Sequence, residues 1–159
     1  MKKILFTILA LLSIQFLWAQ VKNENGHLVT SVEVKFATGT ATLLSESEKA
    51  LAEIKQFLND KESITLIRVE GHVSGGASAS QELSQQRAVA VCNWLINNGI
   101  SCTRVLPVGF GSNKPVADNL TPENRAANTR IHFQIVALRN KLIGGMPADG
   151  GGVALPICD

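Results

Sequence analysis

With 159 residues, the chain is long enough for one domain with its own hydrophobic core. Its formal net charge of +2 equals the two lysines at positions 2 and 3, so the rest of the chain is nearly neutral. A neutral chain with six Phe, two Trp and no Tyr lacks the basic footprint of a nucleic-acid-binding protein.

The first 20 residues predict a cleaved secretory signal peptide. Two lysines precede an apolar stretch from Ile4 to Trp18, and Ala19 is the small residue that a signal peptidase requires. As a helix, about 15 residues cover ~22 Å, short of the ~30 Å hydrocarbon core of a membrane, which argues against the alternative of a membrane anchor. We therefore expect a soluble mature chain without a transmembrane segment, beginning with a mobile segment over residues 21–31.

The first half of the domain predicts a strand, a helix and a second strand. Apolar residues alternate with charged ones from Val32 to Phe36, the pattern of a strand with one buried face. A capping box at Ser45 to Glu48 starts a helix whose apolar stripe ends at Asn59-Asp60. The stretch from Ile64 to Gly71 is apolar at most positions, as expected of a strand inside a covered sheet.

The second half predicts a helix, a strand, a short helix and a last strand. A Gly/Ser/Ala loop over 74–80 leads into a helix over 81–98, which Gly99 terminates. The remaining elements are a strand over 105–111 that Pro107 either places at an edge or shortens, a short helix over 122–127 and a strand over 131–137.

This order of elements predicts an α/β chain of the two-layer α+β kind. Two long helices should cover one face of a mixed four-stranded sheet in a βαβαββ order, with the short helix beside them. The predicted domain spans residues 32–138. Residues 139–159 contain two glycine clusters and predict a flexible tail.

Three cysteines leave one thiol unpaired in any internal pairing, and their presence fits an oxidising compartment. Cys92 is expected on a helix and Cys102 just beyond the turn at Asn98-Gly99, so a disulfide between them is sterically allowed. Two free thiols are the alternative. Cys158 is then left for an intermolecular bond or for none.

Arg87 is the most informative single residue. It follows Leu83 by one helical turn and precedes Val91 by another, so it lies on an apolar stripe, where a charge needs a partner or the domain edge. One interpretation is a structural ion pair with Glu70 or Asp118. The other is a guanidinium that holds a ligand carboxylate, for which its planar fork is suited.

Five motifs in chain order resemble those of one family. They are Phe36 to Leu43 (FATGTATL), Gly71-His72, Leu83 to Ala88 (LSQQRA), Gly109 to Asn119 (GFGSNKPVADN) and Asn124 to Ile131 (NRAANTRI). Each motif is weak alone, but together they resemble an OmpA/MotB-like peptidoglycan-binding domain over about residues 32–138.

The resemblance implies a non-catalytic, periplasmic, cell-envelope-associated module without cofactor or metal, which grips the diaminopimelate stem peptide of peptidoglycan. Arg87 matches the family arginine that pairs with the peptide carboxylate. Where the family has an aspartate for the peptide ammonium this chain has Ser74, and where it has a second arginine this chain has Thr129. An ammonium left without its carboxylate costs about 2–5 kcal/mol. Ser74, Asn119 and Arg125 are the candidate ligand-binding residues beside Arg87.

Two other functions remain open. A scaffold domain that binds a cell-envelope protein would keep the fold and lose the ligand, as the missing aspartate suggests. A hydrolase would use Ser74, Asp118 and His132, which follow the chain order of an α/β-hydrolase triad, but the glycine that a nucleophile elbow needs two residues before the serine is His72.

The remaining residues of interest have ordinary structural interpretations. The three histidines, His27, His72 and His132, are scattered along the chain and do not predict a metal site. His72 at a strand end is expected to be structural. Trp94 is expected at the edge of the core rather than as a platform for a sugar.

Overall fold

The computed structural model describes residues 21–144 and 150–158, so the predicted signal peptide lies outside the described residues. The strands and helices, in chain order, are β1 (Lys22–Glu24), β2 (His27–Val29), α1 (Glu48–Asp60), β3 (Ile64–His72), α2 (Ala77–Asn97), β4 (Val105–Gly111), α3 (Pro122–Asn128), β5 (Arg130–Leu138), β6 (Lys141–Leu142) and β7 (Val153–Ala154). Two 3-10 turns, η1 (Ser45–Ser47) and η2 (Cys102–Arg104), precede α1 and β4. Among these described helices, none has the length and apolar character to cross a membrane.

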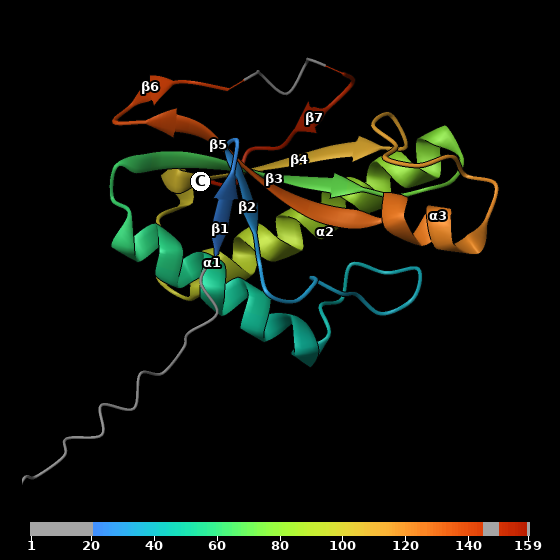
Figure 1. Ribbon diagram of the computed structural model, residues 1–159, viewed down its shortest axis with the longest axis horizontal. Coiled ribbons are helices and arrows are strands. Elements are labelled where there is room, and N and C mark those ends of the chain that lie inside the picture. Colours follow the sequence, from blue (N-terminus) through green and yellow to red (C-terminus); the bar gives the residue numbers. More distant parts are fainter. Residues whose placement is uncertain (1–20, 145–149, 159) are drawn as a thin grey trace, which may run out of the picture.

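The strands form one mixed sheet in the order β1-β2-β5-β3-β4-β7, and β6 pairs with the end of β5. β3 and β4 are parallel and are connected through α2, while the other pairings are antiparallel. Figure 1 shows α1 and α2 on one face of this sheet. The predicted two-layer class is confirmed, although the sheet has seven strands instead of four.

The core lies between the two long helices and the sheet. It is formed by fully buried apolar side chains that alternate along the strands and repeat at helical spacing, among them Leu51, Ile54, Leu58, Ile67, Val69, Val91 and Leu95. Helix α2 lies so close to β3 that a Cβ on Gly71 would be 2.0 Å from the Ser84 carbonyl oxygen. Glycine at this position therefore sets the distance between helix and sheet.

The predicted first strand at Val32 to Phe36 is wrong. Residues 32–35 are outside any strand, and Phe36 makes only an isolated bridge to Leu43. The period-two pattern arises because Val34 and Phe36 pack against the core while the residues between them face solvent. The first strands are instead the β1–β2 hairpin, which pairs through β2 with β5 and buries Leu28, so the segment 21–31 is ordered rather than mobile.

The hairpin had a sequence signal in Asn25-Gly26. Both residues have positive φ, 54° and 89°, as a two-residue type I′ turn requires. Asn-Gly between two short strands is the strongest local sign of such a hairpin. The short length of both strands, three residues each, hides their period in the sequence.

The helices are confirmed, with two corrections at their starts. No side chain caps α1, because the Ser47 hydroxyl instead exchanges hydrogen bonds with the backbone of Lys35, at 2.7 and 2.8 Å. Helix α2 begins at Ala77, so part of the predicted Gly/Ser/Ala loop is helical. The cap of α3 is as predicted, since Thr121 Oγ1 accepts a hydrogen bond from the Asn124 backbone.

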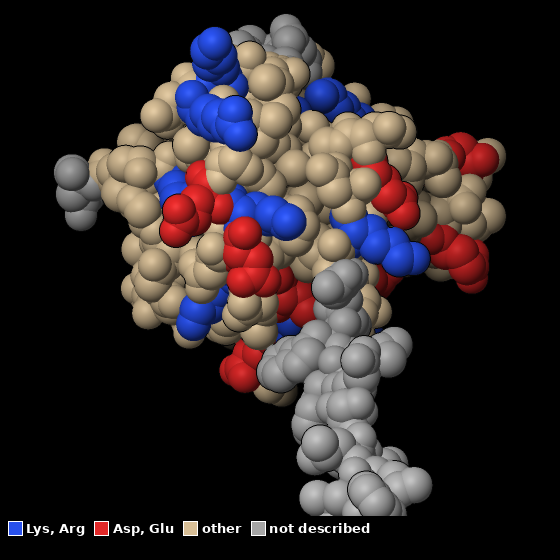
Figure 2. Space-filling model, turned by 60° about the vertical axis from the view of Figure 1, so that its left-hand side comes forward, with Lys and Arg blue, Asp and Glu red and all other residues tan. Residues whose placement is uncertain are grey.

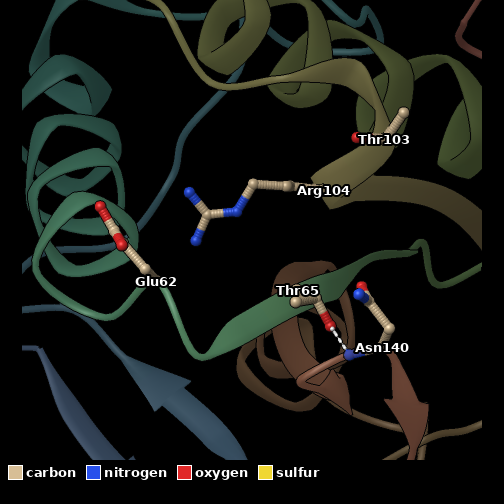
Figure 3. A pocket seen from close by; sticks show the side chains of 5 residues that line it. All are labelled: Glu62, Thr65, Thr103, Arg104 and Asn140. Atoms are coloured by element: carbon tan, nitrogen blue, oxygen red, sulfur yellow. Dashed lines mark hydrogen bonds between the residues drawn. The ribbon is translucent and has the colours of Figure 1, made fainter.

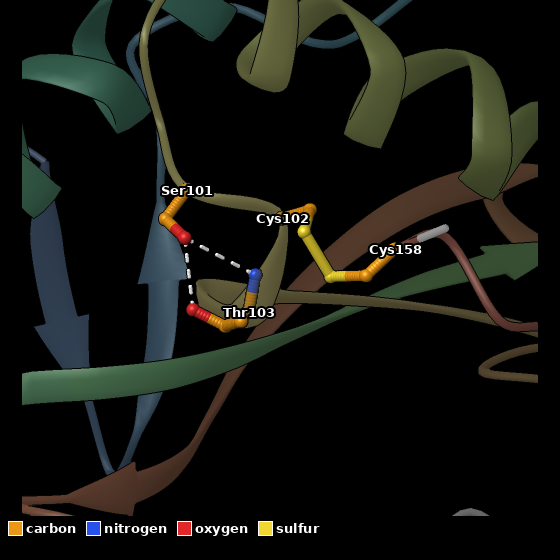
Figure 4. The surroundings of a disulfide bond; sticks show 4 residues. All are labelled: Ser101, Cys102, Thr103 and Cys158. Carbon is orange, nitrogen blue, oxygen red and sulfur yellow. Dashed lines mark hydrogen bonds between the residues drawn. A yellow bond between two sulfur atoms is a disulfide. The ribbon is translucent and has the colours of Figure 1, made fainter.

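The predicted disulfide between Cys92 and Cys102 is wrong. Cys102 is bonded to Cys158 with a Cα–Cα distance of 5.4 Å, as drawn in Figure 4. Cys92 faces the core from α2 and is fully buried, so its thiol is free, and burial raises its pKa well above the ordinary value. Cys102 begins η2 and is partly exposed, within reach of the chain end.

The expectation of a flexible tail is wrong for the described part of residues 139–159. Strand β7 pairs with the outer edge of β4, and the Leu155 backbone N–H donates to the Pro107 carbonyl at 3.1 Å. Ile157 packs against the core beside the disulfide. The sequence conceals these contacts because the glycines around the strand dominate its local composition.

Candidate ligand-binding site

Arg87 lies on α2 and is only 8% exposed. Its Nε donates a hydrogen bond to the Thr40 carbonyl at 2.9 Å, and its guanidinium carbon lies 4.8 Å from the centroid of the Phe36 ring. One edge of the guanidinium and one of its faces are therefore fixed by the protein.

The loop 36–43 that presents these groups is closed by its own backbone. The Ala37 N–H donates to the Thr42 carbonyl at 2.9 Å and the Thr40 N–H donates to the Ala37 carbonyl at 3.0 Å. Gly39 takes a positive φ of 70°, which a residue with a side chain seldom adopts. The loop thus holds the Thr40 carbonyl in place for Arg87.

The predicted alternative of an ion pair between Arg87 and Glu70 or Asp118 is wrong. In the described ranges, no carboxylate lies within 4.0 Å of the Arg87 nitrogens, since Glu70 pairs with Arg68 and Asp118 accepts from Asn124. The two Nη atoms have no hydrogen-bond partner there, and they keep some contact with solvent although the residue as a whole is only 8% exposed. Burial lowers the pKa of Arg87, which means that the cation is poorly solvated and would gain from an anion.

Ser74, just after β3, is tied to the end of α3. Its backbone N–H donates to Thr129 Oγ1 at 3.1 Å, and its hydroxyl lies 3.0 Å from the same oxygen. Because Thr129 gives its one proton to the Arg125 carbonyl, the Ser74 hydroxyl must donate to Thr129. The lone pairs of Ser74 Oγ are left as acceptors for a ligand.

The buried amide of Asn128 organises the loop before α3. Its Oδ1 accepts from the Val116 and Ala117 backbones at 2.7 and 3.0 Å, and its Nδ2 donates to the Ala117 carbonyl and to Asn119 Oδ1, both at 2.8 Å. Arg125 is exposed and donates to the Asn119 and Leu120 carbonyls. Asn119 and Arg125 therefore shape this loop.

The candidate residues form two groups. Arg87 belongs with loop 36–43, whereas Ser74, Asn119 and Arg125 are connected through Thr129 and Asn128; within the described ranges no hydrogen bond joins the two groups. Loop 36–43 and α3 both lie at the end of the molecule toward which β3 and β4 point (Figure 1). This end of the sheet carries the candidate site.

Of two surface pockets, one lies away from these residues and the other reaches the end of loop 36–43 at Leu43. The larger, about 400 Å³, is lined by Glu62, Thr65, Thr103, Arg104 and Asn140 (Figure 3). Arg104 donates there to the Leu58 and Ile64 carbonyls at 2.9 and 2.8 Å, a structural role at the end of α1. The smaller, about 180 Å³, is lined in part by Leu43 and Trp94, and Trp94 packs at the core edge as expected.

The hydrolase interpretation finds no support in the geometry. Ser74 bonds to Thr129, Asp118 accepts from Leu120 and Asn124, and His132 lies against Glu70. Within the described ranges no hydrogen bond connects the three residues of the supposed triad. A proton relay from serine through histidine to aspartate is therefore not assembled.

The three histidines are far apart in the sequence, but the fold brings them together. His72 Nε2 lies 3.3 Å and His132 Nδ1 lies 3.7 Å from Glu70 Oε2, and the His27 ring stacks on His132 with centroids 4.2 Å apart. Arg68 holds the other carboxylate oxygen of Glu70 at 2.5 and 2.6 Å. The strand register that places Glu70 opposite His132 creates this cluster, and the sequence does not reveal it.

The buried cluster has shifted ionisation. Burial alone would raise the pKa of Glu70, but the contacts with His132 and His72 and the Arg68 cation lower it far below its ordinary value. Burial lowers the pKa of His72.

Outside the cluster, the face drawn in Figure 2 carries Lys, Arg, Asp and Glu intermixed, with no single-sign patch of the kind that binds nucleic acid.

Comparisons with known proteins agree with the fold and the motifs. The OmpA family model matches residues 35–129. Outer membrane porin F of Pseudomonas aeruginosa is 36% identical over 109 residues, which are 67% of this chain and 31% of the porin. Peptidoglycan-binding protein ArfA of Mycobacterium bovis is 28% identical over 109 residues, which are 67% of this chain and 33% of ArfA.

A solved structure extends the likeness to three dimensions. The MotB-like protein from Desulfovibrio vulgaris superposes with a TM-score of 0.61 at 25% identity, over 71% of this chain and 77% of that one. The chain spans about a third of the length of the two curated relatives, so the likeness concerns only a part of each. The family model covers more than half of the residues, and the chain belongs to the OmpA family.

Proposed function

We propose that this domain binds peptidoglycan in the cell envelope by holding a stem-peptide carboxylate on Arg87, and that it performs no catalysis. The observation that carries the proposal is the state of the Arg87 guanidinium. It is anchored through Nε and one face, is short of anionic partners in the described structure, and presents both Nη atoms to solvent.

A planar fork with two parallel N–H groups matches a carboxylate in a bidentate manner. Because the Thr40 carbonyl and the Phe36 ring already restrict the side chain, little further conformational entropy is lost when a ligand binds. The name of ArfA, a peptidoglycan-binding protein that matches over the same length, supports the same ligand class.

Ser74 is proposed as the partner of the ligand ammonium, with Asn119 and Arg125 shaping the adjoining loop. Its hydroxyl offers neutral lone pairs where a carboxylate would offer a full charge, so we expect weaker binding than an aspartate would give. Diaminopimelate-type peptides remain the expected ligands, with a reduced contribution from the ammonium. The relatives named above and the predicted signal peptide favour a periplasmic location.

The test is co-sedimentation of the purified protein with isolated sacculi. Wild-type protein should be retained, and Arg87→Ala should weaken retention at least about thirtyfold, since removing one partner of a desolvated charge pair costs about 2–5 kcal/mol. Arg87→Lys keeps the charge but loses the fork and should also bind poorly. The matched control is Arg139→Ala, because Arg139 is an exposed arginine just after the last residue of β5.

Amidation of the diaminopimelate carboxylate in a soluble wall fragment gives a chemical control. It should abolish binding to wild-type protein, because the bidentate acceptor is removed. No retention of wild-type protein on sacculi would overturn the proposal and leave the alternative, a scaffold that contacts a protein of the envelope. The exposed Val116 and Leu120 side chains, 64% and 83% accessible, would then be the first surface to test.

A further inference from the structure

All three histidines of the chain meet on one face of the sheet. Val69 on β3 points into the core toward the helices, so its neighbours Glu70 and, two residues on, His72 point to the opposite face. His132 on β5 lies opposite Glu70 in the antiparallel register. In Figure 1 this is the face that α1 and α2 leave uncovered.

We propose that Glu70, His72 and His132 form a site for a transition-metal ion, with Zn²⁺ as the preferred occupant. One ligand atom from each of the three residues lies within 4.8 Å of the other two. Two imidazoles and one carboxylate are a donor set that zinc takes, with its fourth position left for water. The inference is independent of the proposed binding of peptidoglycan.

The separations around Glu70 Oε2 are close to those expected around a shared metal ion. Tetrahedral bonds of ~2.0–2.1 Å place neighbouring ligand atoms ~3.4 Å apart. Glu70 Oε2 is 3.3 Å from His72 Nε2 and 3.7 Å from His132 Nδ1. The contact with His72 is also a hydrogen bond, but it is longer than the about 2.7–2.9 Å of a strong charge-assisted one. These longer contacts do not reflect loose packing of the whole cluster, because Arg68 contacts the other oxygen of Glu70 at 2.5 and 2.6 Å.

Arg68 has the place of an outer-shell residue. Its guanidinium fixes Oε1 of Glu70 and so directs Oε2 toward the two imidazoles, as outer-shell partners do for metal-bound carboxylates. Its positive charge also opposes a nearby cation, so we expect an affinity in the micromolar range, weaker than in a closed structural zinc site. The two imidazole nitrogens favour borderline ions such as Zn²⁺ over Mg²⁺ or Ca²⁺, which prefer oxygen ligands.

Two further features support the site. His72 is 2% exposed and faces Glu70 Oε2 through Nε2, so the proposed ligand atom is held inside the cluster. The His132 side chain is 32% exposed, which gives an ion a route from solvent. His27 stacks on the His132 ring at an interplanar angle of 15° and is inferred to be a positioning residue.

The experiment titrates the untagged protein, stripped of metal with a chelator, with Zn²⁺ alone in a calorimeter. One ion per chain should bind with micromolar affinity. His132→Ala and His72→Gln should each lose at least about tenfold in affinity, since each removes a ligand. Arg139→Ala, at an exposed residue outside the cluster, should stay within about threefold of wild type. Circular dichroism checks that each variant is folded.

Two outcomes would overturn the site: a folded wild-type protein that binds no stoichiometric Zn²⁺, or binding that survives His132→Ala unchanged. Imidazole proton resonances provide a second measurement that does not depend on any variant. Zn²⁺ should shift the signals of His72 and His132, and shifts confined to His27 would contradict the assigned ligands. Millimolar Mg²⁺ should not compete, and equal competition would indicate only non-specific cation binding.

Discussion

Ser74 and Thr129 hydrogen-bond to each other, with 3.0 Å between their hydroxyl oxygens. These are the two positions at which the chain replaces charged residues of the family pattern, an aspartate and an arginine, by neutral ones. Their contact means that the two departures from the pattern that the sequence resembles lie side by side in the structure.

The first prediction restores one charge. Ser74→Asp should strengthen binding to diaminopimelate-type wall fragments at least about tenfold, because a carboxylate pairs with the ligand ammonium more strongly than a hydroxyl does. Calorimetry with soluble fragments measures it. An unchanged affinity in a folded variant would indicate that Ser74 does not face the ligand.

The second prediction uses the contact between the two positions. Thr129→Arg alone should bind wall fragments no better than wild type. In the double variant with Ser74→Asp, the two new charges should be in contact, so the unfolding free energies should show a coupling of about 0.5–3 kcal/mol. A double-mutant cycle from urea unfolding gives this term. Additive effects would mean that the side chains separate when both are charged.

The third prediction concerns the ring behind Arg87. Phe36→Leu removes the aromatic ring on which the Arg87 guanidinium lies. The lost cation–π contact is worth about 0.5–2 kcal/mol, so retention on sacculi should fall severalfold. Phe57→Leu is the control, because Phe57 also packs at the core edge. Equal loss of retention in both variants would mean that the Phe36 substitution acts by general destabilisation and not through Arg87.

The fourth prediction tests the disulfide. Cys158→Ser should lower the unfolding free energy by up to about 4 kcal/mol, the chain-entropy estimate for cysteines separated by 56 residues. Cys102→Ser should have the same effect, and a reductant should destabilise only the wild type. Thiol titration of the oxidised wild type should detect a single reactive thiol, Cys92, and only after unfolding, because burial raises its pKa. Two thiols would contradict the pairing.

The fifth prediction concerns the spacing between α2 and the sheet. Gly71→Ala places a methyl group 2.0 Å from the Ser84 carbonyl oxygen, so the helix must shift, at a cost of about 3 kcal/mol or more. Gly76→Ala, whose added atom meets nothing within 4 Å, should change stability by less than about 0.5 kcal/mol. Thermal unfolding distinguishes them, and similar melting temperatures would contradict this packing.

Local patterns in the sequence were sufficient for the long elements. The apolar stripe that contains Leu51, Ile54 and Leu58 gave α1, and Thr121-Pro122 gave the start of α3, since caps and helical spacing are encoded by neighbouring residues. The alternation from Val32 to Phe36 was misleading, because it reports one buried side and does not report a pairing partner.

The long-range features could not be predicted in the same way. Which cysteine pairs with Cys102 depends on where the chain end returns, and no local pattern contains that information. The meeting of Glu70 with His132 depends on the register of β3 against β5. Arg87 was singled out by its place on an apolar stripe, but its contacts with Thr40 and Phe36 depend on how loop 36–43 folds.

Strand β7 affects how readily copies of this chain can pair edge to edge. An open row of peptide groups along β4 could accept a strand from another molecule, and growth of that kind leads to aggregates. The chain covers the middle of this row, from Pro107 to Gly109, with residues 153–155, and the nearby bond from Cys158 holds them in place. Strand β7 is only two residues long, so the edge that it presents in turn offers little for a strand of another copy to pair with.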